Sequence, residues 1–335
     1  MKALVICGKS ITDVIFATPA IRALRIDLDE ISVHVLVRPE AAFLLRENPY
    51  VGKVHCLTGV FATWKKLMAE RFDLIINLDE GWQSRILSRF VIAPERRLAT
   101  HHWKKWLMVR LKINQISSKH AVERMMDVIR PLGVKGDNLG LDYFIPDHDK
   151  VSAHWLPGDY RKGYVVFCMS APFFTRKLPL DRMIELCDKI RKPIVLLGTS
   201  EDHHNAEVIG SFFSGSGPLR LQRNEPIFSP RTQIYNACGK YSFNQMASII
   251  KQSWAVFTFD NDFVPVASAF RKQVFGLWGN TSEIFGNYPY RTRYTIMEHT
   301  NLECRPCSAH GFDRCPKGHF KCMREVMFDF HLPDR

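Results

Sequence analysis

The first candidate site in the sequence is a short polar segment between an apolar run and a helical pattern. Residues Gly8 to Asp13 read Gly-Lys-Ser-Ile-Thr-Asp. Backbone N–H groups at the start of a helix favour an anion such as phosphate, and Ser10 and Thr12 could donate further hydrogen bonds. Asp13 is either a helix-capping residue or a carboxylate that acts as a general base. The spacing lacks the Gly-Lys-Ser/Thr ending of a nucleotide-binding P-loop.

Two further candidate sites follow apolar runs in the second half of the chain. Arg176 and Lys177 could pair with a diphosphate, the arginine as a planar fork and the lysine as a point charge. Two adjacent basic residues are also common on an ordinary solvated surface. Asp260, Asn261 and Asp262 stand at another junction between a strand and a helix, where they could hydrogen-bond a ligand or cap the helix.

Cysteines form the fourth candidate site. The chain has nine, and five of them lie singly in apolar surroundings that are typical of small core residues. The other four form the pattern Cys304-x2-Cys307-x7-Cys315-x6-Cys322. Four thiolates at these spacings could hold a structural zinc ion. Reduced structural cysteines and a local disulfide are the alternatives.

A basic and aromatic segment is the fifth candidate. Residues 96–124 carry eight lysines and arginines against one acidic residue, within a chain of formal net charge +12. Trp103, Trp106 and Arg110 would share one helical face, near Lys104 and Lys105. Such a stretch lies on a membrane interface or binds an anionic partner, unless it is a flap that buries its tryptophans. No nucleic-acid-binding module is visible, so we expect no nucleic-acid partner.

The elements that position these residues alternate along the chain. Short apolar runs end at Gly or Asp and predict strands, and three- and four-residue spacings predict helices. The predicted strands are 3–7, 33–37, 74–78, 164–169, 193–197, 254–259 and 273–278. The predicted helices are 14–24, 180–190, 242–251 and 264–270, and a proline at 19 is expected to kink the first. This alternation indicates doubly wound α/β domains with ligands at the carboxyl ends of the strands.

The length of 335 residues suggests two domains. We expect an N-terminal domain over 1–150, a C-terminal domain over 160–303, and a cysteine-rich tail over 304–335 that packs back on the N-terminal domain. No apolar run reaches the length of a membrane helix, and residues 1–7 are too short for a signal peptide. We therefore expect a cytoplasmic protein.

Several segments, taken together, resemble glycosyltransferase family 9, the lipopolysaccharide heptosyltransferases. Ser10-Ile-Thr-Asp13 is similar to the family's Ser-x-Gly-Asp loop. The other similar segments are His120-Ala-Val-Glu-Arg124, Thr175-Arg-Lys-Leu-Pro179, 236–242 and Phe275-Gly-Leu-Trp-Gly-Asn-Thr281. Their order and spacing carry the resemblance, which extends along most of the chain.

The resemblance implies a GT-B fold of two Rossmann-like domains facing a central cleft. It implies an ADP-heptose-like donor bound by the C-terminal domain and an anionic lipopolysaccharide or lipooligosaccharide core acceptor bound by the N-terminal domain, with inversion at the anomeric carbon. Asp13 would be the catalytic base, and Arg176 and Lys177 would neutralise the leaving diphosphate. No metal or other cofactor is then required for catalysis, and the protein would contact the inner membrane peripherally from the cytoplasm.

Three positions depart from the family pattern. Thr12 replaces a glycine before the aspartate, Asp262 replaces a glycine near the donor diphosphate, and Pro265 replaces a histidine. Two hypotheses follow. The chain is an active glycosyltransferase, or it is a catalytically degenerate homologue that binds a glycan, a nucleotide or a protein partner.

Overall fold

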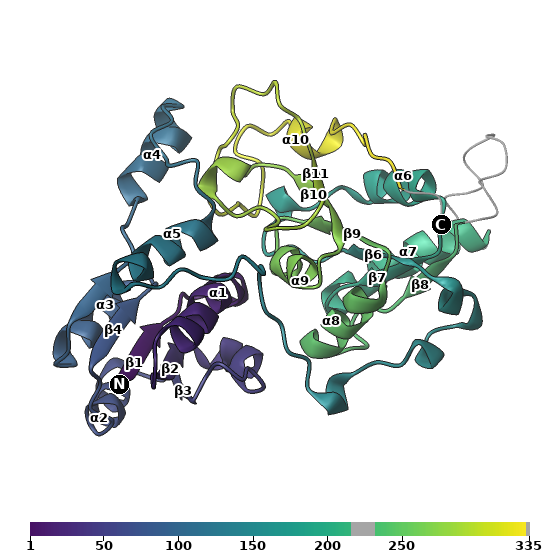
Figure 1. The fold of residues 1–335 in the computed structure, drawn as a ribbon. Coiled ribbons are helices and arrows are strands. Elements are labelled where there is room, and N and C mark those ends of the chain that lie inside the picture. Colours follow the sequence, from purple (N-terminus) through teal and green to yellow (C-terminus); the bar gives the residue numbers. More distant parts are fainter. Residues whose placement is uncertain (216–231, 333–335) are drawn as a thin grey trace. The chain divides into compact units, whose positions relative to one another are not determined.

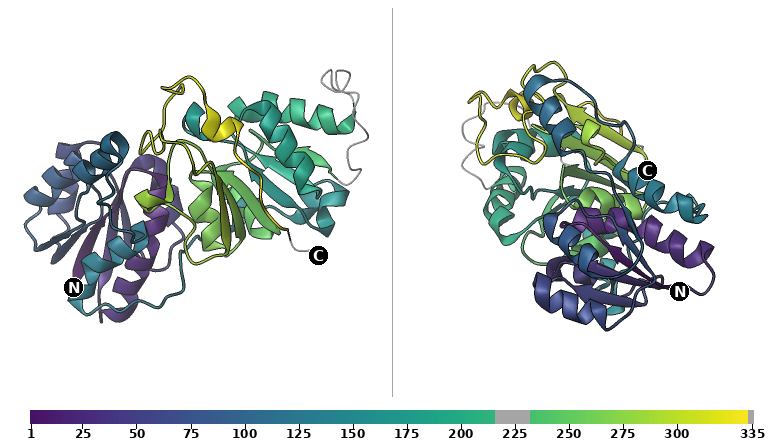
Figure 2. Two further views of the ribbon diagram at one scale, coloured as in Figure 1. Left: turned by 90° about the horizontal axis from the view of Figure 1, so that it is seen from above. Right: turned by 90° about the vertical axis from the view of Figure 1, so that its left-hand side faces the viewer.

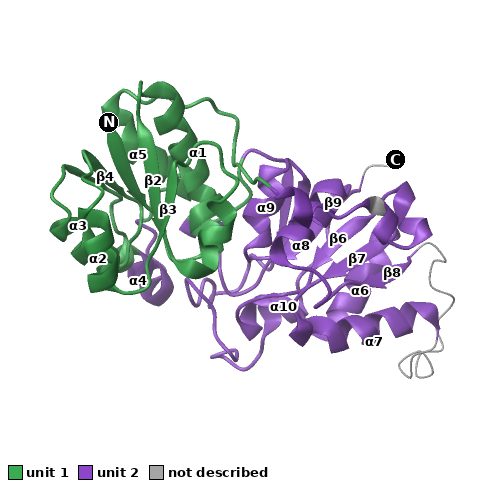
Figure 3. Cartoon of the chain, turned by 90° about the horizontal axis from the view of Figure 1, so that it is seen from below, with its two compact units in different colours: residues 1–104, 116–144, 286–290 green, residues 105–115, 145–285, 291–335 purple. Residues whose placement is uncertain are grey.

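The computed structural model describes residues 1–215 and 232–332. The chain divides into two compact units, which Figure 3 colours separately. Unit 1 contains residues 1–104, 116–144 and 286–290, and unit 2 contains residues 105–115, 145–285 and 291–335. Both units are layered α/β structures, as the sequence predicts (Figure 1).

Unit 1 is built on a parallel five-stranded sheet in the order β3-β2-β1-β4-β5. Its strands are β1 (Lys2–Ile6), β2 (Ser32–Val37), β3 (Lys53–Cys56), β4 (Leu74–Asn77) and β5 (Glu95–Arg97). Its helices are α1 (Ile11–Asp27), α2 (Val60–Met68), α3 (Trp82–Phe90) and α5 (Ala121–Ile129). Helix α4 (His102–Leu111) crosses the division between the units. Leu4 and Ile6 of β1 pack with Leu67 of α2 and Leu87 of α3, so these two helices cover one face of the sheet.

Unit 2 is built on a parallel six-stranded sheet in the order β11-β10-β9-β6-β7-β8. Figure 2 shows two further views of its strands and helices, coloured from teal to yellow. Its strands are β6 (Val165–Cys168), β7 (Ile194–Leu197), β8 (Ile234–Asn236), β9 (Ala255–Phe259), β10 (Gln273–Trp278) and β11 (Tyr294–Glu298). Its helices are α6 (Leu180–Ile190), α7 (His203–Ser214), α8 (Phe243–Gln252), α9 (Phe263–Ala269) and α10 (Lys321–Arg324). The central strands β6, β7 and β9 are apolar and fully buried because helices cover both faces of such a sheet.

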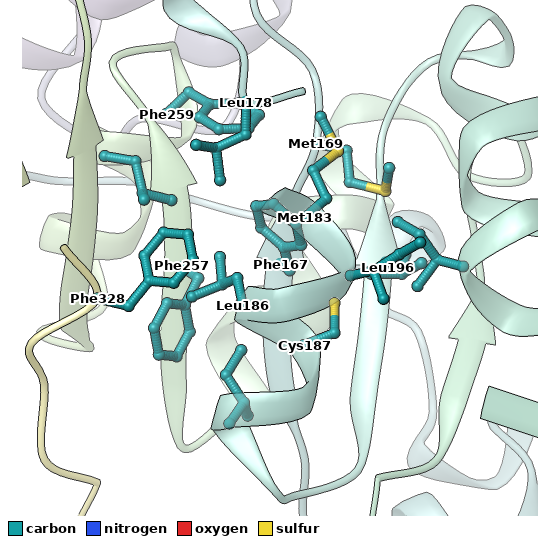
Figure 4. Close-up of a cluster of buried hydrophobic side chains, with 14 of the residues drawn as sticks. Phe167, Met169, Leu178, Met183, Leu186, Cys187, Leu196, Phe257, Phe259 and Phe328 are labelled. Carbon is teal, nitrogen blue, oxygen red and sulfur yellow. The ribbon is translucent and has the colours of Figure 1, made fainter. Parts of the chain in front are cut away.

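The tail after residue 304 packs on unit 2, which differs from our expectation that it packs on the N-terminal domain. Phe320, Met323, Val326 and Phe328 belong to the same buried cluster as Phe257 (Figure 4). Removing these large apolar side chains from water explains the position of the tail. The expected domain boundary near 150 lies at Phe144 and Ile145, and the segments 105–115 and 286–290 interrupt the contiguous division that we expected.

The predicted strands and helices form within a few residues of their expected bounds. Helix α1 contains Pro19 and continues beyond it to Asp27. Proline has no N–H to donate to the carbonyl four residues earlier, which is that of Ile15. The Thr18 hydroxyl donates to this oxygen at 2.7 Å and replaces the missing bond.

The far part of α1 is fixed by a buried arginine. Arg22 donates to Asp137 at 2.7 and 2.8 Å and to the carbonyl of Gly140 at 2.9 Å, and it also pairs with Asp142. Among residues 1–215 and 232–332, no helix has both the length and the apolar composition needed to cross a bilayer.

Candidate active site

The candidate base Asp13 lies in the connection from β1 to α1, where the helix begins with a capping box. Ser10 is the N-cap, and its Oγ accepts the Asp13 N–H at 3.1 Å. The Asp13 carboxylate in turn accepts the Ser10 N–H at 3.2 Å. This pair satisfies two backbone donors that the first turn leaves unpaired. Asp13 is therefore a capping residue, and because a carboxylate has several lone pairs it can accept a further hydrogen bond in this position.

Gly8 is required by the direction of the Asp13 side chain. A Cβ at Gly8 would lie 2.4 Å from Cβ and 2.6 Å from Oδ2 of Asp13. The carboxylate thus folds back over the end of β1 and stays half-buried. Burial, together with the carboxylates of Asp13 and Asp79, raises the pKa of the neighbouring Cys7 thiol. Cys7 therefore stays a neutral core residue.

A second loop meets the first at the carboxyl ends of the neighbouring strands β1 and β4. Asp79 follows β4, and its Oδ1 accepts the Gly81 N–H at 3.1 Å. A Cβ on Gly81 would lie 2.7 Å from Asp79 Oδ2 and 3.3 Å from Lys9 Nζ, so the lysine and the carboxylate approach the same point. Strand order reverses between β1 and β4, which is where ligands bind in open α/β sheets. The sequence predicted a strand ending at this position but did not identify Asp79 as part of the site.

The segment that resembles the family's His-x-Val-x-Arg stretch places Arg124 near the carboxylates of this loop and His120 at the start of α5. Burial lowers the pKa of the Arg124 guanidinium, and the nearby carboxylates of Glu80 and Asp13 partly offset that effect. His120 is the N-cap of α5, since its Nδ1 accepts the Val122 N–H at 3.0 Å while its Nε2 lies 2.7 Å from the Tyr288 carbonyl. Burial lowers its pKa to about 4, so His120 is a neutral structural residue.

In unit 2, the candidate donor residues gather at the corresponding position, between β6 and β9. Asn261 follows β9, and its Nδ2 donates to the carbonyl of Ser170, which follows β6, at 2.7 Å. Its Oδ1 accepts the Thr258 hydroxyl at 2.8 Å and the Phe263 N–H at 2.9 Å. Both ends of this amide are thus used within the protein. Asn261 therefore connects the two loops.

Asp260 is also a positioning residue, because it is directed into the protein. Its Oδ2 accepts the Thr281 hydroxyl at 2.7 Å and lies 3.5 Å from Nη1 of Arg176. Arg176 Nη1 also donates to the Asp260 carbonyl at 2.9 Å. Burial raises the pKa of Asp260, and the Arg176 charge opposes that effect. Asp260 therefore orients Arg176, and Thr281, which the sequence placed only within a motif, completes the contact.

Lys177 is paired with a residue that sequence reasoning missed. It forms an ion pair with Asp202, and the Ser170 hydroxyl donates to the same carboxylate at 2.5 Å. Burial would raise the pKa of Asp202, but the hydrogen bonds from Lys177 and Ser170 outweigh it and hold that pKa below its usual range. The available sequence signal was a Thr199-x-x-Asp202 capping box directly after β7. The predicted basic pair is thus brought together with two carboxylates.

The three departures from the family pattern have simple local explanations. Thr12 is an ordinary helical residue of α1, so its backbone does not need glycine. Asp262 is the residue that precedes α9, and its charge adds to the effects that raise the pKa of Asp260. Pro265 lies in the first turn of α9, where a missing N–H removes no helical hydrogen bond.

The basic and aromatic segment forms helix α4, in which no side chain is buried. Trp103 and Trp106 are each 57% exposed, so the alternative of a flap that buries its tryptophans is wrong. Just beyond α4, the Lys112 ammonium donates to the carbonyls of Cys304 at 3.0 Å and Pro306 at 2.7 Å. The end of this segment is thereby attached to the cysteine-rich tail.

The four tail cysteines influence one another electrostatically, but their sulfur atoms do not all lie within 4.8 Å of one another. All four are free thiols, and burial raises the pKa of Cys322 to about 12. Cys304 Sγ lies 3.8 Å from His319 Nε2. Within the described residues, the potential metal-ligand atoms that lie within 4.8 Å of one another in a group of three belong to His34, His55 and Glu70. None of these residues is in the tail.

That histidine cluster, on strands β2 and β3, is satisfied by the protein itself. His34 Nδ1 and His55 Nε2 are hydrogen bonded at 3.1 Å, and Glu70 pairs with Lys2 and Lys53. Burial lowers the pKa of both imidazoles, that of His55 to about 4. The two lysines give the cluster a positive charge that opposes a metal cation.

Solved structures share the fold of this chain. A glycosyl transferase family 9 protein from Veillonella parvula matches with a TM-score of 0.69 at 16% identity, covering 90% of this chain and 88% of that one. The Escherichia coli ADP-heptose lipopolysaccharide heptosyltransferase II matches with a TM-score of 0.66 at 15% identity, covering 97% and 98%. These similarities confirm the expected GT-B fold class with two Rossmann-like domains.

Among curated proteins, lipopolysaccharide heptosyltransferase 3 of Escherichia coli (strain K12) is 27% identical over 139 residues. The matched part is 36% of this chain and 40% of the length of that relative. The family model for glycosyltransferase family 9 (heptosyltransferase) matches residues 60–313. Because this match spans more than half of the sequence, the chain belongs to glycosyltransferase family 9.

Proposed function

We propose that this protein transfers a heptose-like sugar from an ADP-activated donor to a lipopolysaccharide or lipooligosaccharide core acceptor, with inversion at the anomeric carbon. Family membership supports glycosyl transfer, and the similar proteins named above support this donor and acceptor class. The observation that carries the proposal is the position of the polar residues. In each unit they lie where the strand order of the sheet reverses.

In the proposed reaction, an acceptor hydroxyl oxygen attacks the anomeric carbon while the Asp13 carboxylate takes the hydroxyl proton. The bond from that carbon to the diphosphate oxygen breaks, and ADP leaves with the bonding electron pair. A single displacement of this kind inverts the configuration. The family model matches residues 60–313 and therefore does not cover Asp13. The role proposed for Asp13 is supported instead by its half-buried position over the end of β1.

The role proposed for Arg176 and Lys177 is electrostatic. Charge grows on the diphosphate as the bond breaks, and fixed cations stabilise this charge more strongly in a site that excludes water. Asp260 and Asp202 hold the two cations in place before the donor binds. Lys177 would then share its charge between Asp202 and the diphosphate.

We predict that Asp13→Asn lowers kcat for sugar transfer by about 100-fold or more, because the amide cannot accept the hydroxyl proton. ADP affinity should change little, since Arg176 and Lys177, which we propose hold the diphosphate, lie in unit 2. Steady-state transfer assays with ADP-heptose and calorimetry with ADP test both statements.

The matched control for lost capping is Gln245→Ala, which removes the equivalent residue of the capping box at α8. It should lower thermal stability slightly and leave transfer unchanged. Equal activity of wild type and Asp13→Asn would contradict the assignment. A wild type that binds ADP tightly but transfers no sugar would support the degenerate homologue instead.

We predict that Lys177→Met weakens ADP binding by about tenfold, because the diphosphate loses a cation and meets an uncompensated Asp202. The double variant Lys177→Met/Asp202→Asn should recover part of this loss, since it also removes the repelling carboxylate. Calorimetric titration of ADP into both variants measures the difference. An unchanged affinity in Lys177→Met would place the diphosphate elsewhere.

We also propose that helix α4 contacts the anionic inner face of the membrane that carries the acceptor. The triple variant Lys104→Glu/Lys105→Glu/Arg110→Glu should bind vesicles of phosphatidylcholine and phosphatidylglycerol more weakly by at least about tenfold, and bind ADP as before. Vesicle co-sedimentation at two salt concentrations checks this prediction.

The control variant changes Arg161, Lys162 and Arg191 to glutamate. These are exposed basic residues in the part of unit 2 that follows residue 145, and their replacement gives the same change in net charge. An equal loss of vesicle binding in this control would show that only total charge matters, and the role of α4 would be rejected.

Finally, we propose that the four tail cysteines close around one structural zinc ion, which thiolates favour. Elemental analysis of the purified protein should then find one equivalent, which Cys304→Ser/Cys315→Ser loses and the control Cys56→Ser keeps. A metal-free wild type would leave the tail with reduced cysteines.

A further inference from the structure

Helix α2 exposes an apolar stripe on its outer side. Phe61, Trp64 and Met68 recur at three- and four-residue spacing and therefore share one face of the helix. Phe61 is 65% exposed, and Met68 is also exposed. The buried residues of α2 are Thr63 and Leu67, on another face. Trp64 is half-buried against the core of unit 1, so the helix leaves Phe61 and Met68 in solvent beside a partly covered tryptophan.

Helix α3 repeats this arrangement. Trp82, Ile86 and Phe90 follow one another at four-residue spacing, and all three are exposed. Ile92, just beyond the helix, is 87% exposed. The side that packs on the sheet carries Leu87. Here too the apolar residues in solvent are additional to those that the core requires.

The two stripes form one continuous surface. Helices α2 and α3 pack against each other, as their neighbouring positions in Figures 1 and 3 also show. The Trp64 ring lies 5.6 Å from the ring of Phe61 and 6.3 Å from that of Phe90, and its Nε1 donates to the Phe90 carbonyl at 3.3 Å. We call these exposed faces of α2 and α3, with Ile92, the α2–α3 surface. Soluble proteins rarely expose such contiguous apolar residues without a binding role.

The charges on this surface all have one sign. Lys65, Lys66, Arg85 and Arg89 lie on the two helices, and residues 59–69 and 81–92 contain no aspartate or glutamate. The Lys65 ammonium lies 4.8 Å from the centre of the Phe61 ring. The flanking acids are engaged with other residues, Glu70 with Lys2 and Lys53, and Glu80 with His102.

We propose that the α2–α3 surface docks on an anionic lipid bilayer, with its aromatic side chains in the interface and its lysines and arginines at the headgroups. Aromatic rings prefer the boundary between headgroups and acyl chains, and each nearby basic residue adds attraction to anionic lipid. The charge pattern selects a bilayer over a second copy of this chain, because two such surfaces would repel each other. The inference deepens the proposed function, since a lipid-linked acceptor lies in such a bilayer, but it is tested without sugar transfer.

The test uses the double variant Phe61→Ser/Ile92→Ser, whose substitutions fall on exposed positions and spare the core. Its binding to vesicles of phosphatidylcholine mixed with phosphatidylglycerol should fall by about tenfold, because two apolar side chains no longer leave water. The control Leu139→Ser/Met327→Ser, two exposed apolar residues elsewhere, should bind as the wild type does. Brominated lipid should also quench less fluorescence in Trp82→Phe than in the wild type.

Unchanged binding of the double variant, or an equal loss in the control, would overturn the inference. So would a variant that converts an oligomer into a monomer while vesicle binding persists, since the surface would then be a protein interface. Sugar transfer to a water-soluble acceptor fragment, measured without vesicles, is a separate readout. A wild type that transfers no sugar but binds vesicles through Phe61 and Ile92 would refute the proposed function and support this inference.

Discussion

The hydrogen bonds of Asn261 connect the two strands at the centre of the second sheet. Its amide donates to the Ser170 carbonyl after β6 and accepts from Thr258 and Phe263 around the end of β9. The strand order reverses at this point, so no neighbouring strand fills the space between the two loops. These hydrogen bonds of Asn261 hold the two loops together. Asp260, which directly precedes Asn261, contacts Arg176 and Thr281. A residue first considered as a ligand contact thus serves to assemble the site.

The two units contain the same local arrangement of a glycine and a capping-box aspartate. In each, a strand ends at a glycine and a capping box follows, with its aspartate folded back over that glycine. Gly8 and Asp13 form this arrangement in unit 1, and Gly198 and Asp202 form it in unit 2. Their electrostatic surroundings differ, because Asp202 is buried and paired with Lys177, whereas Asp13 is half-buried and its charge is felt by Cys7 and Arg124. The same backbone arrangement therefore holds a fixed counter-ion in unit 2 and the proposed proton acceptor in unit 1.

Much of the fold was predictable because its central strands are apolar and end at Gly or Asp. Helix α6 and strand β10 have the predicted bounds. The edge strand β5 reads Glu-Arg-Arg and has no apolar signal, so its pairing with β4 alone defines it. Asp202 was missed because its partner Lys177 is far from it in sequence. Periodicity located apolar faces but could not say which of them the sheet covers, and α2 and α3 show apolar residues on more than one face.

The proline in α1 has a consequence for Asp13. Because the Thr18 hydroxyl donates to the carbonyl that Pro19 leaves without its helical partner, α1 continues through the proline, and Asp13 and Arg22 belong to one helix. Nine residues correspond to about two and a half turns, so the two side chains leave the axis on opposite sides. The ion pairs of Arg22 with Asp137 and Asp142 oppose rotation of the helix about its axis. The segment before the second unit thereby anchors the far part of the helix whose first turn carries the Asp13 carboxylate.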